Sequence, residues 1–136
     1  MRQREDFAMN ALEEVLLWLG TQNPLAEQGP IDSRVRDCVE HLCRNLGQRT
    51  TMEGLAAAHN LSVSRLAHLF REQVGVTPQQ FLEQQRMARA KQLLELSGRG
   101  IADIASEVGF DSPFYFTQRF KHATGVCPRD YRKRSR

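Results

Sequence analysis

The sequence repeats one pattern at an offset of 50 residues, and this duplication restricts the folds open to the chain more than any other feature. The repeated positions hold large apolar side chains, a basic residue, a glycine and a proline, in the pairs Leu66/Phe116, Phe70/Phe120, Arg71/Lys121, Gly75/Gly125, Val76/Val126, Pro78/Pro128 and Phe81/Tyr131. The second copy is one residue longer in its turn. We therefore interpret the chain as an internal duplication.

The second copy, residues 101–132, predicts two helices joined by a tight turn. Apolar residues at helical spacing give the first helix one inward face, made of Ile101, Ile104, Ala105 and Val108. Gly109 is expected to end this helix, because glycine tolerates the left-handed conformation. Asp111 or Ser112 can cap the second helix, and Pro113 suits its first turn. A helix, a turn with glycine and a second helix with a polar outer face predict a helix-turn-helix that enters a DNA major groove.

The first copy, residues 50–75, predicts the same arrangement. Thr50 or Thr51 can cap its first helix, and Ser62 can cap the second. The turn falls at His59–Asn60. The inward residues at helical spacing are Met52, Leu55 and Ala56 in the first helix, then Leu66, Leu69 and Phe70 in the second. We therefore expect an all-α fold with two helix-turn-helix subdomains, similar to homeodomains.

A long helix is predicted between the two copies. Thr77 as N-cap, Pro78 in the first turn and Gln80 at the third helical position form a capping-box signature, and the helix can continue to about Leu96. About 20 residues at ~1.5 Å each give a rod of roughly 30 Å. Successive major-groove segments on one side of B-DNA are ~34 Å apart, so this rod could hold two recognition helices one turn apart.

The N-terminal third of the chain predicts two helices and a linker. Residues 1–19 form a helix candidate whose apolar residues follow helical spacing, and Gly20 and Pro24 are expected to end it. This helix either packs on the chain's own core or pairs with a second copy or another domain. Residues 21–31 have linker composition. Asp32 or Ser33 can then cap a helix to about Asn45 with the inward residues Val35, Val39, Leu42 and Leu46. The predicted divisions of the chain are 1–20, 21–31, 32–76, 77–97 and 98–136.

The cysteines do not form a metal or disulfide pattern. Cys38 and Cys43 are five residues apart on one predicted helix with His41 between them, so they diverge on its surface, and no second ligand pair follows. The interpretation is of buried free thiols, with Cys127 as a third reduced cysteine. No cofactor is expected. With no apolar run long enough for a membrane span and no signal-peptide pattern, the expected location is the cytoplasm.

The charge is distributed unevenly. The 136 residues carry a formal net charge of +3. Residues 1–30 hold two Lys or Arg against five Asp or Glu, whereas residues 31–136 hold 17 against 11. The stretch 119–136 alone holds seven basic residues and one acidic residue. The basic part of the chain is thus the part with the turn motifs, as expected for a surface that attracts phosphates.

The region from Ser33 to Arg134 resembles the AraC/XylS family of transcription regulators. The resemblance rests on three stretches: Arg86-Met87 with Ala90, Leu93 and Leu94; the segment from Ile101 to Ser112 with Val108-Gly109-Phe110; and Tyr115-Phe116 with Phe120-Lys121, Gly125, Pro128 and Tyr131-Arg132. It implies a seven-helix DNA-binding unit in which each subdomain places one helix in the major groove. It also implies action at promoters in the bacterial nucleoid, commonly as an activator that touches RNA polymerase.

The resemblance assigns contacts with double-stranded DNA to the second helix of each copy. For base edges we expect Ser64, Ala67, His68, Ser112, Pro113, Thr117 and Gln118. For phosphates we expect Arg65, Arg71, Tyr115, Arg119 and Lys121. Members of the family usually have Arg at the position of Gln118, and a glutamine there can read adenine or act through water.

Other functional classes fit the sequence less well. No Cys-His pair is placed by a motif and no glycine-rich phosphate loop is present, so the chain is not expected to be an enzyme. DNA-repair methyltransferases with a similar domain use a four-cysteine metal site, and this chain has three cysteines. The remaining alternative is a helical protein-interaction adaptor. A homodimer formed through residues 1–20, or through an effector-binding domain absent from this chain, is a further expectation.

Overall fold

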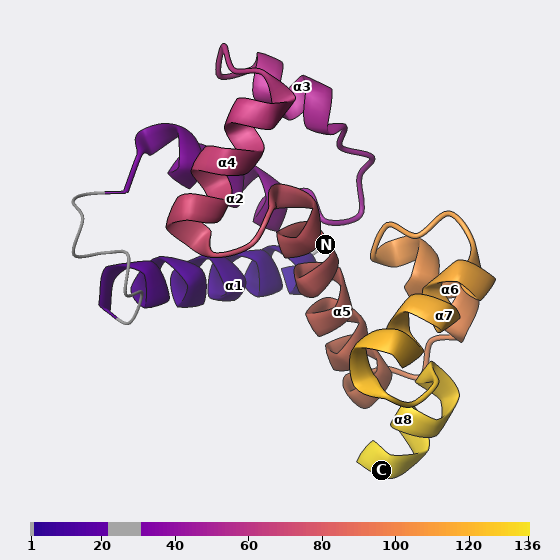
Figure 1. Cartoon of the computed structure of the whole chain (residues 1–136). Coiled ribbons are helices and arrows are strands. Elements are labelled where there is room, and N and C mark those ends of the chain that lie inside the picture. The colour runs from indigo at the N-terminus through magenta and orange to yellow at the C-terminus, as the bar shows by residue number, and fades with distance from the viewer. Residues whose placement is uncertain (1, 22–30) are drawn as a thin grey trace. The chain divides into compact units, whose positions relative to one another are not determined.

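The computed structural model describes residues 2–21 and 31–136, and every regular element in these ranges is a helix (Figure 1). In chain order the helices are α1 (Arg2–Thr21), α2 (Ser33–Arg44), α3 (Met52–Ala57), α4 (Val63–Val74), α5 (Pro78–Leu96), α6 (Ile101–Glu107), α7 (Pro113–Thr124) and α8 (Pro128–Ser135). The all-α fold predicted from the sequence is confirmed. The expected linker at 21–31 lies almost entirely outside the described residues.

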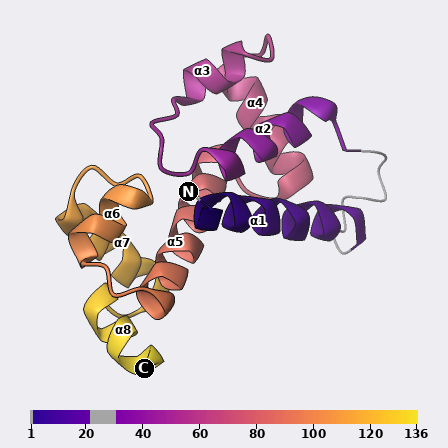
Figure 2. The ribbon, with the colours of Figure 1, turned by 180° about the vertical axis from the view of Figure 1, so that it is seen from behind.

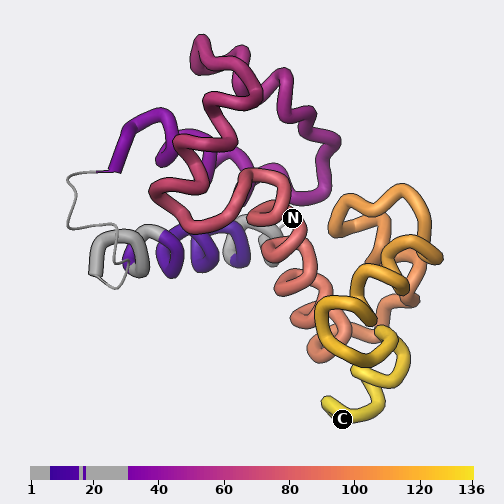
Figure 3. The backbone as a smooth tube through the Cα atoms, in the orientation of Figure 1, coloured from indigo at the N-terminus to yellow at the C-terminus, as the bar shows by residue number. Residues whose placement is uncertain are grey.

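The chain divides into two compact units. One contains Met1–Asn45 and Thr50–Glu83, and the other contains Leu46–Arg49 and Gln84–Arg136. Helix α5 begins in the first unit and ends in the second, and Figure 3 traces it as one continuous helix. The short connection Leu46–Arg49 groups with the second unit although both helices that flank it belong to the first.

In the first unit, α1 lies along α2, as both views of the ribbon show (Figures 1 and 2). Ala8, Ala11 and Leu12 are buried, which favours the interpretation that α1 packs on its own chain. The helix ends at Thr21, between Gly20 and Pro24, the two residues that the sequence predicted would end it. Leu17 remains 66% exposed.

Helix α2 begins as predicted, at a cap formed by Asp32. The Asp32 carboxylate accepts the backbone N–H of Arg34 at 2.8 Å and pairs with the Arg34 guanidinium at 2.8 Å. These hydrogen bonds lower the pKa of Asp32 to about 2. The backbone N–H of Asp32 in turn donates to Gln73 Oε1 at 2.9 Å, which ties the start of α2 to the end of α4. The predicted inward residues of this region are buried: Val35, Val39, Leu42 and Leu46.

The capping box predicted for α5 is complete. The backbone N–H of Thr77 donates to Gln80 Oε1 at 3.0 Å, and the backbone N–H of Gln80 donates to Thr77 Oγ1 at 3.2 Å. Each residue therefore satisfies a backbone group that the first turn of a helix leaves open. The helix ends at Leu96, where the sequence predicted its end.

The second unit has a core of aromatic and aliphatic side chains from α5, α6, α7 and the turn between α6 and α7. Its buried members are Met87, Ala90, Leu93, Leu94, Ile104, Ala105, Val108, Phe110, Phe116 and Phe120. Tyr131 of α8 packs against this core with its ring 5.4 Å from that of Phe120. The Tyr131 hydroxyl donates to the Glu95 carboxylate, and this hydrogen bond raises the pKa of Tyr131 to about 12. Helix α8 is thus joined to both α7 and α5.

The duplication is visible in the packing of both copies. Phe70 and Phe120 are each fully buried, and each meets an aromatic ring edge-on, at 5.7 Å in the first copy and 5.4 Å in the second. Gly75 and Gly125 end α4 and α7 with φ of 96° and 85°. These angles lie in the left-handed region, which explains why glycine occupies both positions.

Candidate nucleic-acid interface

The turn of each helix-turn-helix is closed by a left-handed residue. Asn60 has φ of 56° in the first copy, and Gly109 has φ of 99° in the second. The backbone N–H groups of Leu61 and Phe110 donate to carbonyls of the preceding helix at 3.0 and 2.9 Å. The additional residue of the second copy is Asp111, which lies between Phe110 and the next cap. The turns therefore match the predicted positions.

Helix α4 is fixed at its start by Ser62, whose Oγ accepts the backbone N–H of Arg65 at 3.1 Å. Its buried side comprises Leu66, Leu69, Phe70 and Val74. The opposite side is exposed at Ser64, Arg65, His68 and Arg71, and Ala67 is half-buried. All five α4 residues expected at DNA therefore lie on the outer side of the helix.

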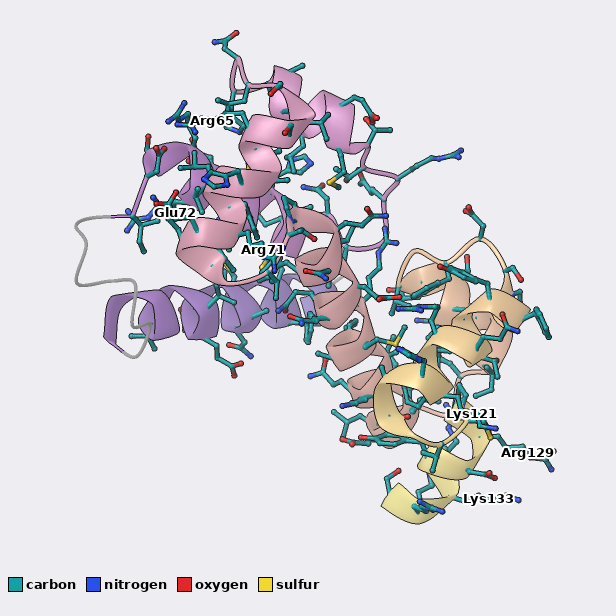
Figure 4. All side chains as sticks on the ribbon, viewed as in Figure 1. Arg65, Arg71, Glu72, Lys121, Arg129 and Lys133 are labelled. Atoms are coloured by element: carbon teal, nitrogen blue, oxygen red, sulfur yellow. The ribbon has the colours of Figure 1, made fainter. Side chains whose placement is uncertain are left out.

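A carboxylate also lies on the exposed side of α4, and sequence analysis did not single it out. Glu72 is exposed, and its carboxylate is 3.9 Å from His68 Nε2 one helical turn away. Figure 4 labels Glu72 together with Arg65 and Arg71 on this helix. A carboxylate can accept a hydrogen bond from cytosine N4 and repels phosphate. The i, i+4 spacing from His68 was the signal that could have identified it.

Helix α7 begins in the same way as α4. Ser112 Oγ accepts the backbone N–H of Tyr115 at 3.2 Å, and Pro113 occupies the first turn. Phe116 and Phe120 form its buried side. The other predicted contact residues lie outward: Pro113, Tyr115, Gln118 and Lys121 are exposed, and Ser112, Thr117 and Arg119 are half-buried. Arg119 also interacts with another part of the chain, so its side chain is not wholly available to DNA.

Phe114 is a further exposed residue that sequence analysis missed. It is 72% exposed in the first turn of α7, next to Tyr115, which is 52% exposed. The offset of 50 places it at the position of Ser64, so the duplication contained the signal. A large apolar side chain in water at the start of this helix suits contact with the methyl group of thymine.

Arg86 positions the turn of the second helix-turn-helix, a role that the family motif did not specify. Its Nε donates to the Leu46 carbonyl at 2.9 Å and its Nη2 donates to the Gln48 carbonyl at 3.2 Å. Its guanidinium lies 5.8 Å from the centre of the Phe110 ring. Arg132 has a similar role on α8, donating to the carbonyls of Leu94 and Ser97. Both arginines hold backbone carbonyls about 40 residues away in the chain.

Cys38 and Cys43 are buried thiols on α2. Burial raises the pKa of Cys38 to about 11 and that of Cys43 to about 12, and Asp37 contributes to the first of these shifts. Both thiols therefore stay protonated at neutral pH and are weak nucleophiles. Among residues 2–21 and 31–136, no group of three or more His, Cys, Asp or Glu could hold a metal ion. None of the described helices is both long and apolar enough to cross a membrane.

Two helix-turn-helix units, each with a capped second helix and a polar outer side, define a DNA-binding protein of the helix-turn-helix class. Residues 55–134 match the family described as helix-turn-helix domain. The chain belongs to this family, in its AraC-type branch. Its relatives include transcription regulators such as an arabinose operon regulatory protein and the HTH-type transcriptional activator RhaR.

Three relatives illustrate the similarity. The arabinose operon regulatory protein of Salmonella typhimurium is 38% identical over 132 residues, which cover 96% of this chain and 47% of that protein. The C-terminal domain of AraT, a response regulator from Geobacillus stearothermophilus, has a TM-score of 0.73 and 30% identity over 77% of this chain and 88% of that domain. The DNA-binding domain of AdpA, a global transcriptional factor solved in complex with a target DNA, has a TM-score of 0.64 and 32% identity over 82% of this chain and 92% of that domain. The chain thus spans about half the length of the curated relative.

Proposed function

We propose that this chain binds a specific site in promoter DNA through α4 and α7, which enter two successive major-groove segments. The observation that carries the proposal is the common construction of the two helices. Each helix starts at a serine cap and exposes polar and basic residues on its outer side. On the inner side, α4 buries Leu66 and Phe70, and α7 buries Phe116 and Phe120 at the equivalent positions. Helix α5 has 19 residues, about 28 Å at 1.5 Å each, against the ~34 Å between groove segments.

The side chains divide into two roles. Base-edge contacts are assigned to Ser64, Ala67, His68, Ser112, Pro113, Thr117 and Gln118, with Phe114 added from its exposure. Phosphate contacts are assigned to Arg65, Arg71, Tyr115, Arg119 and Lys121. Arginine, lysine and tyrosine side chains on phosphates set the register of a protein on the duplex, whereas short or amide side chains at base edges set its sequence preference.

The regulatory role extends this proposal. The chain acts as a transcription regulator in the bacterial nucleoid, as an activator that contacts RNA polymerase, and the named relative supports arabinose-operon control as its setting. A homodimer would form through residues 1–20 or through an effector-binding domain outside this chain. The exposed side chains of Met9 and Leu17 on α1 support the first of these routes.

Selection of binding sites from random duplex DNA tests the proposal directly. The expected result is an enriched sequence with two half-sites whose centres are about 10 base pairs apart, as two recognition helices one helical turn apart require. Recovery of a single half-site would refute the two-helix mode. Absence of any enriched sequence, with salt-sensitive binding to all duplexes, would refute specific recognition and favour a helical interaction adaptor.

A further inference from the structure

Three basic side chains extend the outer side of α7 onto α8. Lys121 lies in the last turn of α7, and Arg129 and Lys133 are four residues apart on α8, which packs against α7. Figure 4 shows the three on these neighbouring helices. All are exposed, and among the described residues none has a hydrogen bond or an ion pair with another side chain. We call Lys121, Arg129 and Lys133 the basic strip.

Two other basic residues at this end of the chain, Arg132 and Arg136, have structural roles, and the basic strip does not. Arg132 donates to the carbonyls of Leu94 and Ser97 at 3.2 and 3.3 Å, and Arg136 donates to Ser97 at 2.9 Å. These contacts hold α8 against the end of α5. The strip residues therefore add positive charge to the surface without contributing to the contacts that position the helix.

The first copy shares the packing of the second but lacks the net positive charge of the basic strip. At the offset of 50, Lys121 corresponds to Arg71, but Arg129 corresponds to Gln79 and Lys133 to Glu83. The strip therefore carries three positive charges in the second copy, while the same positions in the first copy sum to zero. The core, the glycine cap and the proline start of the following helix are shared. The charge difference is thus independent of the packing that both copies need.

We propose that the basic strip binds the phosphates of duplex DNA just outside the half-site read by α7, so that the second unit holds DNA with two helices and the first with one. This inference rests on the proposed function. Continuity favours DNA over an acidic protein, because Lys121 belongs to the same helix as Pro113 and Gln118. Side chains at i, i+4 on a helix start 5–6 Å apart, close enough to meet neighbouring phosphates of one strand.

Salt dependence of binding tests the phosphate assignment. For the selected duplex, R129A/K133A should reduce the slope of log K against log salt by roughly 1.8, since each lost phosphate contact on B-DNA contributes ~0.9. The ratio of specific to random binding should stay the same. The control is R134A, which removes one charge from an adjacent face of the same helix and should leave the slope unchanged. The inference would be overturned if R129A/K133A kept the wild-type slope. It would also be overturned if R134A reduced the slope by as much per removed charge as the double variant does.

A second experiment compares the binding of the wild-type chain to two duplexes, so a folding defect of a variant cannot affect this comparison. One duplex ends at the edge of the α7 half-site and the other continues for 10 base pairs beyond it. The wild type should bind the longer duplex several-fold more tightly, and R129A/K133A should lose most of this preference. Equal wild-type binding to both would overturn the inference alone. Failure of the wild type to prefer the selected site over a scrambled one would instead refute the proposed function. A loss of transcription by R129A/K133A with unchanged DNA binding would assign the strip to a protein partner and overturn the DNA assignment.

Discussion

Substitution of Gly109 by alanine should destabilise the second unit more than the same change at Gly125, although both glycines have left-handed backbone angles. The φ values are 99° and 85°, so each substitution incurs the left-handed penalty of roughly 1–2 kcal/mol. The surroundings differ. A Cβ at Gly109 would lie 2.7 Å from the Leu46 carbonyl oxygen and 2.8 Å from Arg86 Cζ, whereas a Cβ at Gly125 would meet nothing within 4 Å.

The contact at Gly109 is with a backbone atom that cannot easily move. The Leu46 carbonyl accepts the hydrogen bond from Arg86 Nε, so shifting it also disturbs that bond. Overpacking of this kind typically costs 1–3 kcal/mol. We therefore expect G109A to lower the free energy of unfolding by roughly 2–5 kcal/mol and G125A by roughly 1–2 kcal/mol.

Thermal and urea unfolding followed by circular dichroism measures the difference between the two variants. Because the chain has two units, hydrogen exchange of amides in α6 and α7 assigns the loss to the second unit. In a domain of 60–100 residues, each kcal/mol of destabilisation lowers Tm by roughly 4–8 °C. The additional loss of roughly 1–3 kcal/mol expected for G109A should therefore give it a clearly lower Tm than G125A. Equal destabilisation by G109A and G125A would show that the close approach of Leu46 and Gly109 contributes nothing beyond backbone strain.

Three further predictions concern other parts of the molecule. His68→Ala and Gln118→Ala should each lose ~1–3 kcal/mol of binding free energy at the selected site and little on random DNA, measured by fluorescence anisotropy; unchanged ratios for both would refute the base-edge assignment. Arg86→Ala should destabilise the second unit by roughly 1.5–3 kcal/mol in urea unfolding, because hydrogen bonds from a charged donor are lost, and a null result would contradict the positioning role. The carboxylate of Asp32 has a pKa lowered from 3.8 to about 2, so its stabilisation is present above pH 4 and is lost as the pH falls towards 2. Asp32→Asn should therefore flatten the dependence of unfolding on pH between 4 and 2, and an unaltered profile would exclude that contribution.

The sequence predicted most reliably the features that are encoded within a few residues. Thr51, Ser62 and Ser112 each accept a backbone N–H three residues later, because an N-cap depends only on its own side chain and the first turn of the helix. The periodic apolar residues of α4 and α7 likewise face the core, since helical spacing alone fixes their side. The two turns were placed correctly for the same reason.

Features that depend on distant residues could not be predicted in this way. Arg86 was part of a recognised pattern, but its acceptors are carbonyls 40 and 38 residues earlier in the chain, and no local pattern indicates them. Gly109 was expected as a helix end, and the structure adds that its missing side chain lets Leu46 approach. The end of α1 was predicted from Gly20 and Pro24, and the helix ends between them, at Thr21.

The two copies share a scaffold and differ in the residues that face outward, and this difference gives the duplication its functional meaning. A pair of identical helices would read the same bases twice and would hold DNA equally at both ends. Instead, α4 carries His68 next to Glu72, whereas α7 carries Phe114 and Gln118. Under the proposed function these two sets would contact different base edges, so the two half-sites are expected to differ in sequence. The divergence of the two outer faces is therefore as important to the proposed function as the similarity of the two cores.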